Sequence, residues 1–243
     1  MQERQEGFMR KQLKFELQKM KLQSVYGMVP LFSLLSSLGI LTRSIMAKAP
    51  LRSAIVSDGG LFRIIFWFVC GYLICGIFSE EYHDKTLKTV LPLSRSRGVY
   101  LGAKALVATG YCAFTFLVFS LTKDILGRLL YSGARIDLIE EMALPFAGAC
   151  LGVFVIVCLA AVVITLTENE AMTAGVVFGA IILMVILENV SIIASYVPTY
   201  WINSFSSSPA RAGMIFPVSI IMMIAVFLLS VAARAFCKKD LYV

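Results

Sequence analysis

Six runs of apolar residues alternate with polar segments along the chain. They cover residues 25–41, 61–79, 101–121, 143–166, 172–195 and 212–233. A helix that crosses the hydrocarbon core of a bilayer needs about 20 mostly apolar residues. Backbone N–H and C=O groups cannot stay unpaired in lipid, so each run is expected to be helical. The pattern predicts an all-α integral membrane protein with six transmembrane helices.

The composition supports a membrane protein rather than a soluble one. The chain has 243 residues, of which 59% are hydrophobic and 15% are charged, whereas about a quarter of an average soluble domain is charged. The net charge of +7 could suggest a nucleic-acid partner. The basic residues flank the apolar runs instead of lining one face, so no nucleic acid is expected.

The basic residues predict the orientation in the membrane, because cytoplasmic loops carry an excess of Lys and Arg. With the N-terminus inside, 14 basic residues fall on the inner side and 8 on the outer side. We therefore expect a multi-pass protein of the cell membrane with both termini cytoplasmic. Its predicted parts are a cytoplasmic segment 1–24, a six-span domain 25–236 and a tail 237–243. The first run is expected to be a retained anchor, since no small-residue cleavage site follows it.

The N-terminal segment has the pattern of an amphipathic helix. Met9, Leu13, Leu17 and Met20 fall on one helical face, and basic residues occupy much of the rest. This predicts a helix that lies in the membrane interface and contacts anionic lipids. The alternative is a charged tail that only sets the topology.

Motifs for nucleotide or metal chemistry are absent from the sequence. There is no G-x-x-x-x-G-K-[ST] loop, no H-E-x-x-H motif, and a single histidine, His83. The six cysteines form no C-x-x-C pair and are interpreted as small apolar packing residues. We expect no cofactor in this chain and no enzymatic activity of its own. If the protein uses ATP, another chain must bind it.

The loop after the second run is predicted to contain a short helix. Ser79 is suited to cap its start, and Pro92 would end it. Acidic residues at the start of this helix interact favourably with the positive N-terminal end of its dipole. Apolar residues further along the helix would form one face. The alternative is a solvated connector with a basic end. The predicted docking residues are Glu80, Glu81, Asp84, Lys85, Thr86, Leu87, Val90 and Leu91.

This loop resembles that of type-2 ABC exporter permeases. Glu81 precedes Lys85-Thr86-Leu87, then Leu91-Pro92-Leu93-Ser94-Arg95, and Lys104 opens the third run. The family has a glycine where Lys85 stands here. The order of parts along the chain is also similar to that in the family: an amphipathic N-terminal segment comes first, six spans follow, and the C-terminal end is basic.

The resemblance implies a permease subunit of an ATP-driven exporter. The loop would be a coupling helix that docks on a separate ATPase subunit, which binds ATP and Mg. A second permease copy or a paralogue would complete the pathway. The alternatives are an integral membrane enzyme, or a channel or scaffold that works without an ATPase. The sequence leaves the substrate open among peptides, drugs, lipids and polysaccharides.

Glu188 and Asn189 are polar residues inside the fifth run. A charged carboxylate at the bilayer centre is costly, at roughly 2.5–3.5 kcal/mol on insertion scales. Glu188 either lines the substrate pathway or pairs across helices, or it lies at the outer interface beyond a shorter span. Lys104, near the N-terminal end of its run, is expected to extend its ammonium group to the interface.

Three further patterns concern packing. The pairs Gly148/Gly152 and Gly175/Gly179 have the spacing that allows close helix approach. The short segment that contains Glu168 and Glu170 predicts adjacent, antiparallel fourth and fifth helices. The aromatic residues of the last outer loop predict an interfacial belt, although the resemblance implies short re-entrant helices there. They are Tyr196, Tyr200, Trp201 and Phe205.

Overall fold

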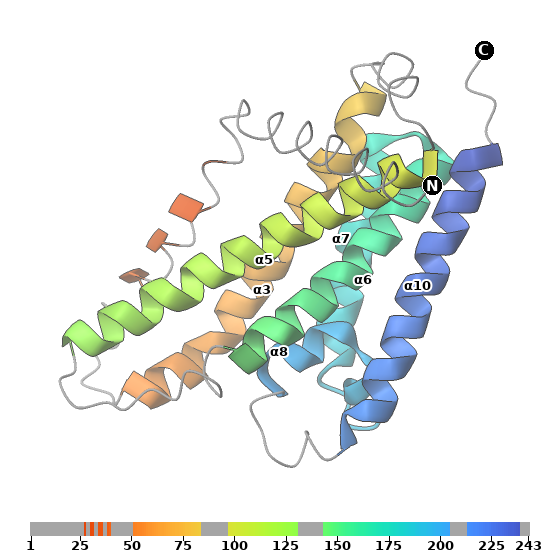
Figure 1. The fold of residues 1–243 in the computed structure, drawn as a ribbon. Helices are drawn as coiled ribbons and strands as arrows, with labels where there is room; N and C mark the ends of the chain where they lie inside the picture. Colours follow the sequence, from red (N-terminus) through yellow and green to blue (C-terminus); the bar gives the residue numbers. More distant parts are fainter. Residues whose placement is uncertain are drawn as a thin grey trace, which may run out of the picture.

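The computed structural model describes residues 51–83, 97–130, 143–204 and 213–238, and a few positions of the first apolar run. Every regular element in these ranges is helical (Figure 1). They are α3 (Leu51–His83), α5 (Arg97–Leu130), α6 (Leu144–Thr167), α7 (Glu170–Leu187), the 3₁₀ helices η3 (Ala194–Tyr196) and η4 (Pro198–Tyr200), α8 (Trp201–Ser204) and α10 (Ile215–Lys238).

Five of these helices are long and apolar enough to cross a membrane. The candidate spans are Ile64–Tyr82, Gly98–Thr122, Leu144–Thr167, Glu170–Leu187 and Ile215–Lys238. They correspond to the second to sixth predicted runs. The first run, 25–41, lies largely outside the described residues, as does the N-terminal segment 1–24, so the sixth span and the interfacial helix stay predictions. The part of the chain that the structure describes is therefore an all-α membrane protein.

The spans pack around α6. This helix contacts α3, α5, α7, α8 and α10, and in Figure 1 it lies between α5 and α10. By contrast, α7 and α10 keep much of their apolar surface exposed, for example at Ile186 (58%) and Phe227 (65%). In a membrane such surfaces face lipid or another subunit.

The turn between α6 and α7 is as short as the sequence indicates. Glu168 ends α6 in the left-handed conformation, with φ of 52°. Asn169 then caps α7, because its side-chain oxygen accepts a hydrogen bond from the Met172 N–H at 3.2 Å. The predicted antiparallel contact between these helices is confirmed.

Two glycines of α6 allow close packing. A Cβ atom on Gly148 would overlap the main-chain carbonyl of Trp201, and one on Gly152 would overlap the Trp67 ring. The close approach predicted for this pair is confirmed. Gly175 and Gly179 differ, because nothing lies within 4 Å of a Cβ added at either position. This pair therefore contacts no neighbouring helix within the described part of the chain, and its role in close helix approach stays a prediction.

Two predicted boundaries are wrong. The Ser79 hydroxyl donates to the Cys75 carbonyl at 2.7 Å inside α3, so no new helix begins at Ser79. A serine within a helix commonly bonds the carbonyl four residues back, so its residue type alone does not identify a cap. The fifth run also stops being one helix after Leu187, where turns and the short helices η3 and η4 follow.

Candidate functional site

A buried ion pair joins the end of α3 to the beginning of α5. Glu81 lies in the last turn of α3, and Lys104 lies in the second turn of α5. The Lys104 Nζ atom is 2.5 Å from Glu81 Oε2, and it donates a hydrogen bond to the Ile77 carbonyl at 2.9 Å. The side chains are 2% and 0% exposed, respectively. One lysine thus contacts two successive turns at the end of α3.

Aromatic side chains connect the pair to the other helices. Lys104 Nζ lies 5.3 Å from the centroid of the Tyr100 ring, a cation–π distance. The Tyr100 ring stacks on Phe236 of α10, with centroids 5.9 Å apart. On the other side, the Tyr82 hydroxyl lies near the Thr165 side chain of α6. We call this end of the bundle, where α3, α6 and α10 finish and α5 begins, the paired end.

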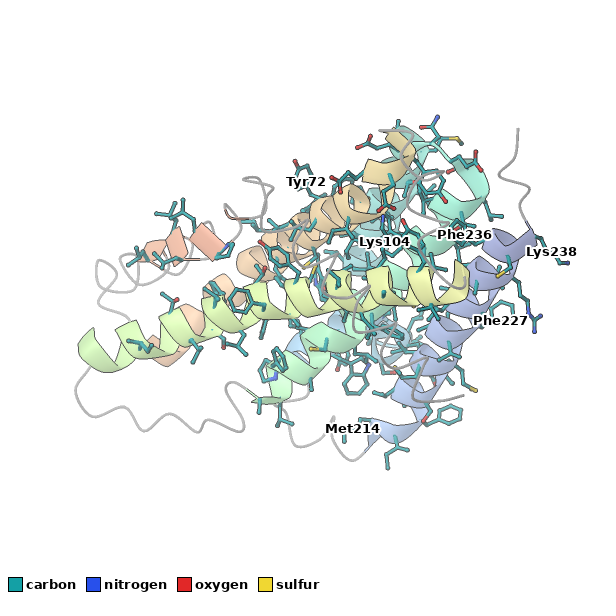
Figure 2. All side chains as sticks on the ribbon, turned by 45° about the horizontal axis from the view of Figure 1, so that its top comes forward. Tyr72, Lys104, Met214, Phe227, Phe236 and Lys238 are labelled. Carbon is teal, nitrogen blue, oxygen red and sulfur yellow. The ribbon has the colours of Figure 1, made fainter. Side chains whose placement is uncertain are left out.

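The environment of Lys104 differs from the sequence-based expectation. Its ammonium group was expected to reach the membrane interface, but it lies inside the bundle, as Figure 2 shows, while Lys238 lies at the exposed C-terminal end of α10. Desolvating two charges is costly, and the short ion pair and the additional hydrogen bond offset that cost. Removing one partner of such a pair typically costs about 3–5 kcal/mol, because it leaves a buried charge without compensation.

The predicted docking residues fall into two groups. Glu80 and Glu81 belong to α3, where Glu81 is buried and Glu80 is half-buried. The remaining members lie outside the described residues: Asp84, Lys85, Thr86, Leu87, Val90 and Leu91. The structure therefore brings Glu81 together with Lys104, the two residues that begin and end the matching motif.

Glu188 and Asn189 lie at the opposite end of the bundle. Glu188 directly follows α7, its side chain is 8% exposed, and its Oε2 atom accepts a hydrogen bond from the Thr199 hydroxyl at 3.1 Å. Asn189 is exposed, and its amide donates to the Val185 carbonyl at 2.8 Å. Glu188 is thus at a helix end rather than in the middle of a span, and it connects α7 to η4.

The aromatic residues beyond α7 differ in their burial. Trp201 is 1% exposed, packs against α6, and donates its indole N–H to the Ser195 carbonyl at 2.9 Å. Tyr196 is 42% exposed. This segment forms the short helices η3, η4 and α8 (Figure 1), and their re-entry into the membrane stays a prediction. Phe205 lies outside the described residues.

Several members of the paired end were missed from sequence. Nothing in the pattern singled out Tyr100, Phe236 or Thr165. A signal for the ion pair existed, since Glu81 follows the second apolar run by two residues and Lys104 lies near the start of the third. Consecutive spans are antiparallel, so the end of the second span and the start of the third lie at the same side of the membrane. An ion pair between these two opposite charges could therefore be expected from the sequence.

The paired end is suited to holding helices in place. Its charges neutralise each other, and the Lys104 ammonium group has two acceptors on α3. Within the described ranges no three His, Cys, Asp or Glu side chains gather where a metal ion could bind. What the arrangement offers is a rigid connection between the two helices that flank residues 84–96.

Comparison with known proteins identifies the family. No curated protein matches the chain. The family model described as "ABC-2 family transporter protein" matches residues 12–187, more than half of the chain. The match contains the first apolar run, both members of the ion pair and the whole of α7, and it ends one residue before Glu188. The chain therefore belongs to the ABC-2 family of transporter proteins, as a multi-pass membrane permease.

Proposed function

We propose that this chain is the permease subunit of an ATP-driven exporter, powered by a separate ATPase that docks on the segment between α3 and α5. The observation that carries the proposal is the buried Glu81–Lys104 pair, which fixes both helices that flank this segment. A docked partner that displaces residues 84–96 would pull on a connected pair of helix ends. Family membership supports the same function.

The partner supplies the nucleotide chemistry in this proposal. The chain's sequence has no P-loop, so ATP and Mg are bound by the ATPase subunit. The paired end then faces the cytoplasm, and both termini are cytoplasmic. The excess of basic residues predicted for that side supports this orientation. Export would carry the substrate toward the end where Glu188 lies.

Two permease copies, or this chain and a paralogue, form the pathway in our proposal. The buried residues of the described spans are mostly apolar, and the charged ones among them form the Glu81–Lys104 pair at one end. One subunit thus offers little polar surface inside for a substrate to cross. The exposed faces of α7 and α10 are available to a second copy, with membrane lipids covering the rest.

Purification of the tagged wild-type chain from its native membrane tests the proposal. We expect a second protein that carries a nucleotide-binding loop to co-purify in near-stoichiometric amount, because the family's permeases act in complexes. Mass spectrometry of the purified sample identifies it. A chain that is purified without any ATPase, in several mild detergents, would favour a lone channel or a membrane enzyme.

We further propose that Glu188 contributes its charge to the outer part of the substrate pathway. Glu188→Gln keeps an oxygen that can accept the Thr199 hydroxyl, so the helix end should stay intact while the charge is lost. Export should fall at least fivefold at unchanged protein level. The measurement compares compounds released into the medium by cells with and without the wild-type chain, using mass spectrometry.

Thr199→Val is the matched control for Glu188, because it removes the hydrogen bond and keeps the carboxylate. We expect it to export within about twofold of the wild type. Normal export by Glu188→Gln would return Glu188 to a role at the interface. Equal losses in the two variants would show that the hydrogen bond, rather than the charge, matters.

A further inference from the structure

The Glu81–Lys104 pair brackets the segment on which the proposed ATPase docks. Glu81 lies three residues before Asp84, and Lys104 lies eight residues after Ser96. We infer that the pair is a fixed strut, which makes the ends of α3 and α5 move as one body when the ATPase displaces residues 84–96. Both residues are then positioning residues for transport. This inference rests on the proposed function.

The contacts of Lys104 make the strut rigid. Its ammonium group is bound by two acceptors on α3, Glu81 Oε2 and the Ile77 carbonyl, which are four residues apart and so lie one above the other on the helix. A cation also interacts favourably with the carbonyl-rich C-terminal end of α3. A rotation or axial shift of one helix against the other would break at least one of these contacts.

The strut extends beyond these two helices. Tyr100 lies one turn before Lys104 on α5, under the ammonium group, and stacks on Phe236 of α10. Figure 2 places the labelled residues Lys104 and Phe236 near the same end of the bundle. A displacement of the α3 and α5 ends would therefore be passed to α10, which has an exposed surface for a second subunit.

Stability alone does not explain a buried ion pair. Replacing such a pair with apolar side chains of similar volume is often neutral or stabilising. A charged pair that is fully buried instead fixes one geometry, because the bond directions and distances allow few alternatives. We therefore expect coupling to depend on the pair more strongly than folding does.

The double variant Glu81→Gln/Lys104→Met tests the strut in the full complex with its ATPase. Both replacements are close in size to the native side chains and leave no buried charge. We expect a melting temperature within a few degrees of the wild type and at least half of the bound ATPase. ATP turnover stimulated by the permease should nevertheless fall at least fivefold. Turnover equal to that of the wild type would overturn the inference.

A covalent link distinguishes a fixed strut from a contact that must open. In a variant whose native cysteines are replaced, Glu81→Cys/Lys104→Cys removes the pair, and a short bis-methanethiosulfonate reagent reconnects the two positions. The unlinked protein should behave as the neutral double variant, and linking should restore most of the turnover. Low turnover after complete linking would contradict a fixed strut.

The link also separates this inference from the proposed partner. Reaction of both cysteines with one reagent molecule needs no ATPase, so its yield in native membranes measures the contact itself. If no ATPase is found, the proposed function fails. A high yield would then still support the fixed contact between α3 and α5, and a low yield would overturn it.

Discussion

Replacing Gly148 with alanine will lower the melting temperature of the purified chain by roughly 2–12 °C. Its new Cβ atom would overlap the Trp201 carbonyl and lie 2.8 Å from the Ile202 nitrogen, all of which are main-chain atoms. A flexible side chain could move away, but this backbone belongs to α8, which packs along α6. Overpacking of this kind costs about 1–3 kcal/mol, and in a chain of this size each kcal/mol corresponds to about 2–4 °C.

Gly110→Ala is the matched control for Gly148→Ala. Gly110 lies in the span of α5, is exposed, and has nothing within 4 Å of an added Cβ. Alanine at such a position should be neutral or stabilising by up to about 1 kcal/mol, since it restricts the unfolded chain. Thermal denaturation of both variants in the same detergent gives the comparison. Equal melting temperatures for the two would contradict the packing of α8 on α6.

The spans were predictable because hydropathy is a local property. Each apolar run from 61–79 to 212–233 overlaps a helix of the structure. The turn at Glu168 was predictable for a related reason, since two residues leave no other geometry than adjacent, antiparallel helices. These features need no knowledge of which helix lies beside which.

The contacts between helices were harder to predict. Whether Lys104 reaches solvent or Glu81 depends on the rotation of α5 about its axis and on its depth relative to α3, which hydropathy does not determine. Gly148 and Gly179 have similar sequence surroundings, yet only Gly148 faces a neighbouring backbone. Hydropathy also did not predict the end of α7, because apolar residues such as Ile192 continue beyond Glu188 and keep the average hydropathy high.

We also expect a large loss of ATPase binding from a substitution on the predicted docking face. On the helix predicted from the sequence, Leu87, Val90 and Leu91 share one side. A buried leucine contributes about 1.5–3 kcal/mol through the area removed from water. Leu87→Asp would lose that contribution and would also bury a charge without a partner. A loss of 3 kcal/mol weakens binding by roughly two orders of magnitude, so retention of the ATPase should be nearly abolished.

Thr89→Asp provides the matched control, because Thr89 lies on the opposite side of the same predicted helix. It introduces the same charge two residues away, outside the proposed contact. We expect it to retain the ATPase at close to the wild-type level. Both variants should insert normally, since neither changes an apolar run or the Glu81–Lys104 pair.

The most direct test of the coupling proposal is a pull-down with a parallel measurement of ATP hydrolysis. Tagged wild type, Leu87→Asp and Thr89→Asp are purified from the native membrane in one detergent, and the bound ATPase and its turnover are quantified. We predict that the wild type and Thr89→Asp retain and stimulate the ATPase, whereas Leu87→Asp retains less than a tenth. Equal recovery and equal stimulation in all three would contradict docking through this segment.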